Sequence, residues 1–328
     1  MNNQKGFITV ATGKWYCYLA QNLVMSYRLF GNCDLPFYVI TDQKGEKMLK
    51  KYFDGVIVVE HPHYNFLDKI DVYKNSPFEE TIFLDADMNI VKDISFLFDK
   101  FEEIGSEVSC YGGLTEISEE HQPTHFGKAA VEIFGLTHFI MFGGGMYYYK
   151  KSEAADRLID RIYNDLIPNY DKYDLVHIGA YFGNDIRAMA DEPLMGLAML
   201  ICGMTPMNSV EHLMRYYKGN MMETIQWDME KRDCSFVWWG QLIHPNIVHY
   251  ATYNTWTWKY NLLNAKLRNR YFKTPKPFGW LRIVGAKLKW AFSGRQLKEF
   301  FRWFGAHFTP TYWKQKFKRG NRGGNKID

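Results

Sequence analysis

Two aspartates one residue apart follow an apolar run in the stretch IFLDADMNIV, residues 82–91. Carboxylates are costly to bury and repel one another at close range. On a strand, positions i and i+2 point to the same side, so Asp85 and Asp87 could reach one cation, directly or through water. Oxygen ligands suit Mg²⁺ or Mn²⁺, which keep open positions for diphosphate oxygens. Covalent chemistry on an aspartate and a solvated pair at a strand end are the alternatives.

The start of the chain offers small residues at the end of a strand. GFITVAT (6–12) reads as a strand and ends in Ala11 and Thr12, and Gly13 follows. Such small residues allow a nucleotide to approach the backbone closely. Tyr16 comes next and could stack on a base, although an aromatic residue at a helix start also suits packing on the core.

A lysine precedes the aspartate pair along the chain. Lys69 lies in LDKIDVY (67–73), a stretch that favours a helix ending at Pro77. A lysine there could contact a diphosphate, and the alternative for a lone lysine is a solvated helix face.

The elements that must position these residues alternate between strands and helices over the first 100 residues. This order predicts an α/β fold with a mostly parallel sheet flanked by helices, and with sites at the carboxyl ends of the strands. The predicted strands are 6–12, 35–41, 55–60 and 81–87, and the predicted helices are 15–30, 43–52 and 67–76.

Beyond residue 100 the pattern is less regular. HFIMFGGGMYYYKKS (138–152) predicts a strand, a glycine turn and a second strand, and 152–167 predicts an amphipathic helix. A helix is expected to start at Asp191, and LIHPNIVHY (242–250) predicts a late strand ending at His249.

The charge of the chain is unevenly distributed. Residues 256–328 hold 18 lysines and arginines against Glu299 and Asp328, whereas the net charge of the whole chain is +4. We therefore predict an α/β domain over 1–255 and a basic, aromatic helical extension over 256–328, disordered beyond about residue 318.

Amphipathic helices with interleaved aromatic and basic residues suit the plane of an anionic membrane surface. Packing of these helices on the first domain is the alternative. Binding to nucleic acid is not expected, because no nucleic-acid module is recognisable.

Five scattered cysteines without a CxxC pair argue for reduced thiols and against a disulfide framework or a zinc site. The start MNNQKGFITV has no signal-peptide pattern. The uncharged stretches 133–149 and 193–210 are interrupted by polar residues, glycine or proline, so we expect buried core segments rather than membrane spans. We expect a cytoplasmic protein, peripheral at the inner face of a membrane.

One long run resembles a known family. LDKIDVYKNSPFEETIFLDADMNIVKDI (67–94) is similar to the corresponding segment of glycosyltransferase family 8, the group of glycogenin and the lipopolysaccharide galactosyltransferases. Those enzymes have the GT-A fold, a Rossmann-like α/β domain that binds a nucleotide-sugar. The resemblance implies that Lys69 contacts the donor. It also implies that Asp85, Ala86 and Asp87 form the motif that holds Mn²⁺ (or Mg²⁺) and the donor diphosphate.

Two further segments resemble the donor-binding parts of the family. FITVATGKWY (7–16) is similar to its nucleotide-binding first strand, and FGGGMYYYKKS (142–152) resembles its Phe-Asn-x-Gly stretch near the donor sugar, with Gly143 in place of Asn. The donor contacts that the resemblance implies from these segments are Thr9, Ala11, Thr12, Tyr16, Gly143 and Gly144.

The last two segments resemble the reacting centre. DEPLM (191–195) is similar to the family's Asp-Gln stretch, which implies catalytic roles for Asp191 and for Glu192, here in place of Gln. NIVHY (246–250) resembles the late strand that supplies the third metal ligand, here His249. The family's downstream Gly and Lys are not matched, and Lys259 is the substitute we expect.

The sequence thus predicts a metal-dependent glycosyltransferase that moves a hexose from a nucleotide-sugar, by resemblance UDP-linked, to a cell-surface glycan or lipid-linked acceptor, with retention of configuration. A non-catalytic nucleotide-sugar or glycan-binding protein is the alternative that Gly143 and Glu192 motivate. A phosphatase of the haloacid dehalogenase type is disfavoured, because it expects Thr or Val where Asn89 stands and carries its motif on the first strand.

Overall fold

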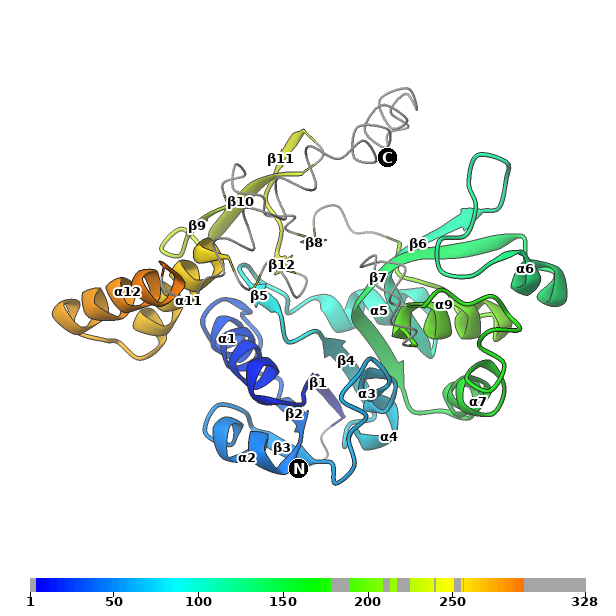
Figure 1. The fold of residues 1–328 in the computed structure, drawn as a ribbon, viewed down its shortest axis with the longest axis horizontal. Coiled ribbons are helices and arrows are strands. Elements are labelled where there is room, and N and C mark those ends of the chain that lie inside the picture. Colours follow the sequence, from blue (N-terminus) through cyan, green and yellow to red (C-terminus); the bar gives the residue numbers. More distant parts are fainter. Residues whose placement is uncertain are drawn as a thin grey trace. The chain divides into compact units, whose positions relative to one another are not determined.

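The computed structural model describes residues 4–177, 189–208, 213–216, 225–238, 240–250, 255 and 257–291. The chain divides into two compact units (Figure 1). The first comprises Met1–Arg215 and Pro245–His249, and the second comprises Tyr216–His244 and Tyr250–Asp328. The domain boundary expected after residue 255 stays a prediction.

A six-stranded sheet in the order β3-β2-β1-β4-β7-β6 lies at the centre of the first unit (Figure 1). Its parallel strands are β1 (Lys5–Ala11), β2 (Phe37–Thr41), β3 (Gly55–Val58) and β4 (Glu80–Leu84). The antiparallel strands β7 (His138–Lys150) and β6 (Val108–Glu116) complete it. The predicted α/β class with a mostly parallel sheet is therefore confirmed.

Helices accompany the sheet, and α1 packs against β1 while α9 packs against β7 (Figure 1). Phe7 of β1, Tyr27 of α1 and Phe37 of β2 form an interlocked aromatic group in the core, with ring centroids 5.1–5.8 Å apart. Burying each such side chain contributes about 1.5–3 kcal/mol. The helices of this unit are α1 (Lys14–Phe30), α2 (Gln43–Leu49), α3 (Leu67–Ile70), α4 (Val72–Asn75), α5 (Leu97–Ile104), α6 (Lys128–Phe134), α7 (Glu153–Arg161) with the π-helix Ile162–Leu166, and α9 (Asp191–Ile201).

The aspartate pair lies just beyond the strand that was predicted to contain it. β4 ends at Leu84, and Met88 N donates to Asp85 O at 3.3 Å to close a turn. The short strand β5 (Met88–Ile90) follows and pairs antiparallel with β12 (Ile247–His249). Together with β8 (Met214–Tyr216) these strands form a small sheet in the order β5-β12-β8.

Three predicted elements differ from the observed ones in more than the position of their ends. The helix expected over 67–76 is two short helices, α3 and α4, with Asp71 between them. The expected strand, turn and strand over 138–152 is the single strand β7, and its register with β6 shifts between the pairs Cys110–Tyr147 and Gly112–Phe142, so the extra residues fall in the glycine segment of β7. The late strand divides around Pro245, which has no N–H for a ladder.

The second unit contains a three-stranded antiparallel sheet and a pair of helices. The sheet has the order β11-β10-β9, with β9 (Gln226–Asp228), β10 (Asp233–Trp238) and β11 (Gln241–Ile243). α11 (Trp258–Tyr271) packs against α12 (Lys276–Ala291), which includes the basic, aromatic helix expected from residue 280. The remainder of that extension, from residue 292, lies outside the described residues. In the described part of the chain, no helix combines the length and apolar character needed to cross a bilayer.

Candidate active site

Asp85, Asp87 and His249 come together in the first unit. One ligand atom from each lies within 4.8 Å of the other two. His249 Nε2 is 3.0 Å from Asp87 Oδ1 and 3.6 Å from Asp85 Oδ2. The β5–β12 ladder, in which His249 stands opposite Met88, brings the histidine to the turn that carries the aspartates.

The pKa of each of these three groups depends on its charged neighbours and on burial. Burial raises the pKa of Asp85 to about 6, opposed by Lys69 and reinforced by Asp87. Burial also works against ionisation of Asp87, but the neighbouring His249 holds the pKa of Asp87 below its usual value. Burial alone would lower the pKa of His249, whereas Asp87 raises it. Two carboxylates and an imidazole nitrogen this close fit a divalent cation such as Mn²⁺ or Mg²⁺.

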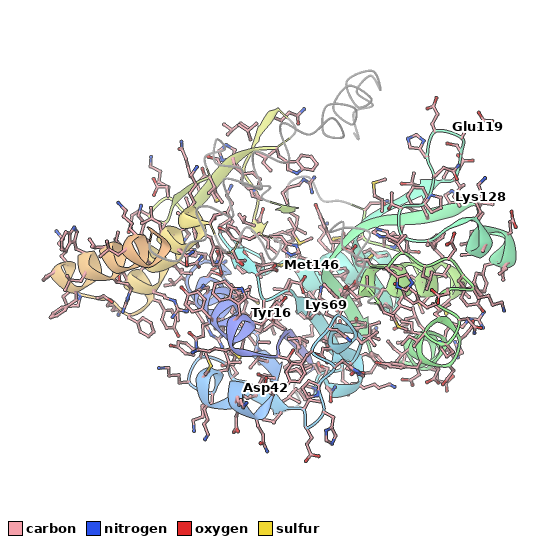
Figure 2. The ribbon with its side chains drawn as sticks, in the orientation of Figure 1. Tyr16, Asp42, Lys69, Glu119, Lys128 and Met146 are labelled. Carbon is pink, nitrogen blue, oxygen red and sulfur yellow. The ribbon has the colours of Figure 1, made fainter. Side chains whose placement is uncertain are left out.

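Lys69, on α3 (Figure 2), contacts the same cluster. Its Nζ donates to Asp85 Oδ2 at 2.9 Å and to Gly144 O at 3.1 Å, and it lies 3.4 Å from Asp191 Oδ2. Although burial would lower the pKa of Lys69, Asp191 and Asp85 raise it above its ordinary value. The ammonium group is therefore held charged beside the aspartate pair.

Asp191 and Glu192 occupy the first turn of α9. Asp191 is 2% exposed, and Tyr147 Oη donates to its Oδ2 at 2.7 Å. Glu192 Oε1 accepts a hydrogen bond from Gly144 N at 2.6 Å. Burial and then Asp191 raise the pKa of Glu192 to about 7. These contacts place both carboxyl groups against the backbone of β7, next to Lys69.

The glycines of β7 permit this close approach. A Cβ on Gly144 would lie 2.5 Å from Asp191 Oδ2 and 2.8 Å from Glu192 Cγ. On Gly145 it would lie 2.7 Å from His249 Nδ1. Gly143 precedes them in the same strand.

The segment expected to bind the nucleotide lies at the end of β1. Thr9 and Ala11 are fully buried, so their side chains are part of the core. Thr12 Oγ1 donates to Asp68 Oδ2 at 3.0 Å, and Gly13 N donates to Asp42 Oδ2 at 2.8 Å. Gly13 has a φ of 84°, which favours glycine.

Tyr16, on α1, is 40% exposed (Figure 2). Ala86, between the two aspartates, is 4% exposed. Lys259 belongs to α11 of the second unit, and its contact with the donor stays a prediction.

Three residues of this region were not found from the sequence. Tyr147 contacts Asp191 on the same side as Gly144, although the two residues are three positions apart in β7, so strand alternation gave no signal for it. His125 Nδ1 lies 3.7 Å from Glu192 Oε2 but comes from a loop without a pattern. Asp68 precedes Lys69 in the chain, and its role at the site is apparent only from its hydrogen bonds in the structure.

No protein-family model and no curated protein matches the chain. Solved structures of glycosyltransferases are similar to it. Mouse xyloside xylosyltransferase 1 in its apo form is 11% identical, with a TM-score of 0.42, over 65% of this chain and 88% of that one. The galactosyltransferase LgtC in complex with donor and acceptor sugar analogues is 10% identical, with a TM-score of 0.46, over 76% of this chain and 87% of its own. An active-site mutant of LgtC gives the same values. These three structures are of glycosyltransferases.

Proposed function

We propose that this chain is a metal-dependent glycosyltransferase that transfers a hexose from a nucleotide-sugar, UDP-linked, to a cell-surface glycan or lipid-linked acceptor. The observation that carries the proposal is the meeting of Asp85, Asp87 and His249 beside the charged Lys69. The four residues lie beyond the carboxyl end of β4 in a mostly parallel sheet, where ligands of α/β folds bind.

Asp85, Asp87 and His249 would hold Mn²⁺ or Mg²⁺. When bound, the cation supplies positive charge that stabilises the diphosphate as the leaving group. Lys69 adds a second positive charge from the protein itself, held in place by Asp85 and Gly144 O. The Lys69 ammonium would thereby stabilise the negative charge that develops on the diphosphate oxygen as the bond from the sugar to the diphosphate breaks.

Asp191 is the carboxylate best placed to stabilise positive charge on the sugar. Tyr147 and Lys69 fix its Oδ2, and the residue is almost fully buried. Glu192 orients the adjoining backbone through Gly144 N. We propose that transfer proceeds with retention of configuration, as the resemblance to glycosyltransferase family 8 implies.

The acceptor is proposed to lie at the inner face of a membrane. On α12, Phe278, Trp280, Leu281 and Leu288 are each more than half exposed, with Lys276 and Lys287 on the same helix. An amphipathic helix of this composition suits an anionic lipid surface. Co-sedimentation with phosphatidylglycerol vesicles, compared with phosphatidylcholine vesicles, tests it, and equal binding to both would contradict it.

The enzymatic proposal is tested by turnover of nucleotide-sugars with Mn²⁺. A thermal-shift screen of UDP-, GDP- and CDP-sugars, with and without Mn²⁺, first identifies the donor. Donor hydrolysis or transfer is then measured for the wild type and for Asp85→Asn. Unchanged turnover in this variant would contradict the proposal.

The alternative is a protein that binds a nucleotide-sugar or glycan without transferring it. Glu192 favours this alternative, because it places a carboxyl group where the family has an amide. It predicts Mn²⁺-dependent binding of UDP with neither hydrolysis nor transfer of any donor.

A further inference from the structure

The carboxylate of Asp68 accepts hydrogen bonds from two separate segments of the chain. Its side chain is buried, and its Oδ1 accepts from His63 N at 2.7 Å. Its Oδ2 accepts from Tyr64 N at 3.1 Å and from Thr12 Oγ1 at 3.0 Å. The carboxylate therefore joins the loop before α3 to the turn after β1.

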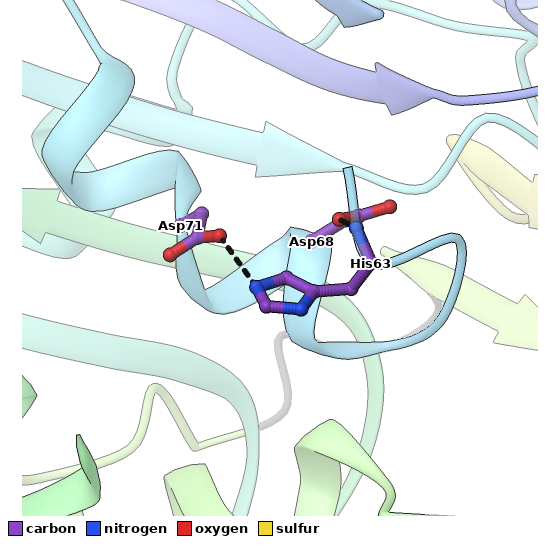
Figure 3. A group of neighbouring side chains, drawn as sticks. All are labelled: His63, Asp68 and Asp71. Atoms are coloured by element: carbon purple, nitrogen blue, oxygen red, sulfur yellow. Dashed lines mark hydrogen bonds and ion pairs between the residues drawn. The ribbon is translucent and has the colours of Figure 1, made fainter. Parts of the chain in front are cut away.

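The neighbourhood of Asp68 is shown in Figure 3. The ligand atoms of His63, Asp68 and Asp71 lie close enough to one another to bind one cation, if distance is the only criterion. His63 Nε2 lies 3.3 Å from Asp71 Oδ2. However, both oxygens of Asp68 already accept hydrogen bonds, and Asp71 Oδ1 accepts one from Tyr163 Oη. The group is therefore a hydrogen-bonded support for α3 rather than a metal site.

The loop conformation is adapted to this carboxylate. Successive N–H groups of His63 and Tyr64 both point to Asp68, as backbone amides do around an anion. Tyr64 has a φ of 55°, which is strained for a residue with a side chain. Such a conformation persists where surrounding contacts over-determine it, and Asp68 supplies those contacts.

The two segments joined by Asp68 carry the groups proposed to bind the two ends of the donor. Thr12 and Gly13 form the turn expected to approach the nucleotide, and Asp42 holds that turn from its other side through Gly13 N. Lys69 follows Asp68 directly on α3 and reaches Asp85. Asp68 is thus the direct link between the nucleotide turn and the lysine of the diphosphate site.

We propose that Asp68 is a positioning residue of the donor site, which fixes the Thr12–Gly13 turn and Lys69 in one rigid arrangement. Preorganisation of this kind reduces the entropy lost on binding, so it raises the affinity for the nucleoside diphosphate without a contact from Asp68 itself. The part concerning the donor rests on the proposed function, whereas the coupling of the two segments does not.

The binding test uses the full chain and four variants. Asp68→Asn and Thr12→Val each remove one side of the link, and the double variant removes both. Asp71→Asn is the matched control, since Asp71 is a hydrogen-bonded aspartate at the end of the same helix and has no contact with Thr12 in the described structure. Calorimetry then measures the Kd of UDP with Mn²⁺, and the Kd of Mn²⁺ alone.

We expect UDP affinity to fall about tenfold in Asp68→Asn, the effect of losing a hydrogen bond to a charged group. The double variant should bind no more weakly than Asp68→Asn, because both changes break one link. Mn²⁺ affinity should stay within about twofold, since Asp85, Asp87 and His249 are intact. Wild-type UDP affinity in Asp68→Asn, or a parallel loss of Mn²⁺ affinity, would overturn the proposal.

Hydrogen exchange tests the coupling without any nucleotide. In Asp68→Asn, peptides covering 11–16 and 63–70 should both exchange faster, whereas Asp71→Asn should leave 11–16 unchanged. Faster exchange confined to 63–70 in Asp68→Asn would overturn the coupling. If the wild type binds no nucleotide at all, the proposed function fails, and the exchange measurement still decides whether Asp68 joins the two segments.

Discussion

His249 Nε2 lies 3.0 Å from Asp87 Oδ1, although the two residues belong to distant parts of the chain. The contact follows from the pairing of two three-residue strands, β5 and β12. In this ladder His249 lies opposite Met88, the residue that follows Asp87. A ladder this short holds because its residues are fully buried on both strands. The candidate metal site therefore depends on a small sheet beside the large one.

The affinity for Mn²⁺ is expected to decrease as the pH is lowered. Asp85 has a pKa raised to about 6, so below that pH a proton competes with the cation for its oxygens. His249 must also lose its proton to bind the cation, and Asp87 raises the pKa of His249 above its ordinary value. The Kd should therefore rise by more than about tenfold for each pH unit below 6. Calorimetric titrations at pH 5, 6, 7 and 8 check this, and a Kd independent of pH would contradict it.

Replacing Asp87 by Asn should abolish the metal-dependent part of the activity. The amide keeps the shape but removes the charge that pairs with His249 and would bind the cation. Turnover should drop at least about 100-fold, with loss of the Mn²⁺-induced rise in Tm. A variant that keeps this rise would show that the cation binds elsewhere. Asp93→Asn is the control, because Asp93 is a half-buried aspartate whose carboxylate accepts hydrogen bonds from Ser95 N and Asn32 Nδ2, outside the cluster.

Substitution of Gly144 by Ala is expected to disturb the site directly. The new Cβ would lie 2.5 Å from Asp191 Oδ2, which Tyr147 holds in place. Overpacking of this kind costs about 1–3 kcal/mol, so the free energy of unfolding and the turnover should both fall. Gly113→Ala is the control, because a Cβ there meets nothing within 4 Å. Equal effects of the two substitutions in chemical denaturation would contradict the argument.

Glu192→Gln should stabilise the protein at high pH and not at low pH. Burial and Asp191 raise the pKa of Glu192 to about 7, above its unfolded value, so the folded state holds this proton more tightly. The stability that the proton supplies is present at pH 4 and is lost as pH rises through 7. Glutamine cannot ionise, so the variant should gain about 1–2 kcal/mol at pH 8, a figure reduced for the partly exposed side chain. Urea denaturation at pH 5 and 8 measures the difference, and a gain of equal size at both would refute it.

The order of the first strands and helices could be predicted from local pattern. The buried strands β1, β2 and β4 read as short apolar runs, and a parallel sheet requires helices between them. That order alone puts Thr12 and the aspartate pair at carboxyl strand ends, and hence at one edge of the sheet. The types and positions of Asp85 and Asp87 alone allowed a cation site, whereas Lys69 joined them only through the resemblance of residues 67–94 to glycosyltransferase family 8.

The tertiary structure decided what depends on pairing between distant segments. It made 138–150 one strand, with β4 paired to its second half and β6 paired to both halves on either side of the glycines. In this arrangement Gly144 and Gly145 meet Asp191 and His249. The link from Asp68 to Thr12 likewise has no local signal, since a hydrogen bond between separate loops leaves no period in the sequence. The sequence thus determined which groups stand at the strand ends, and the long-range packing determined which of them touch.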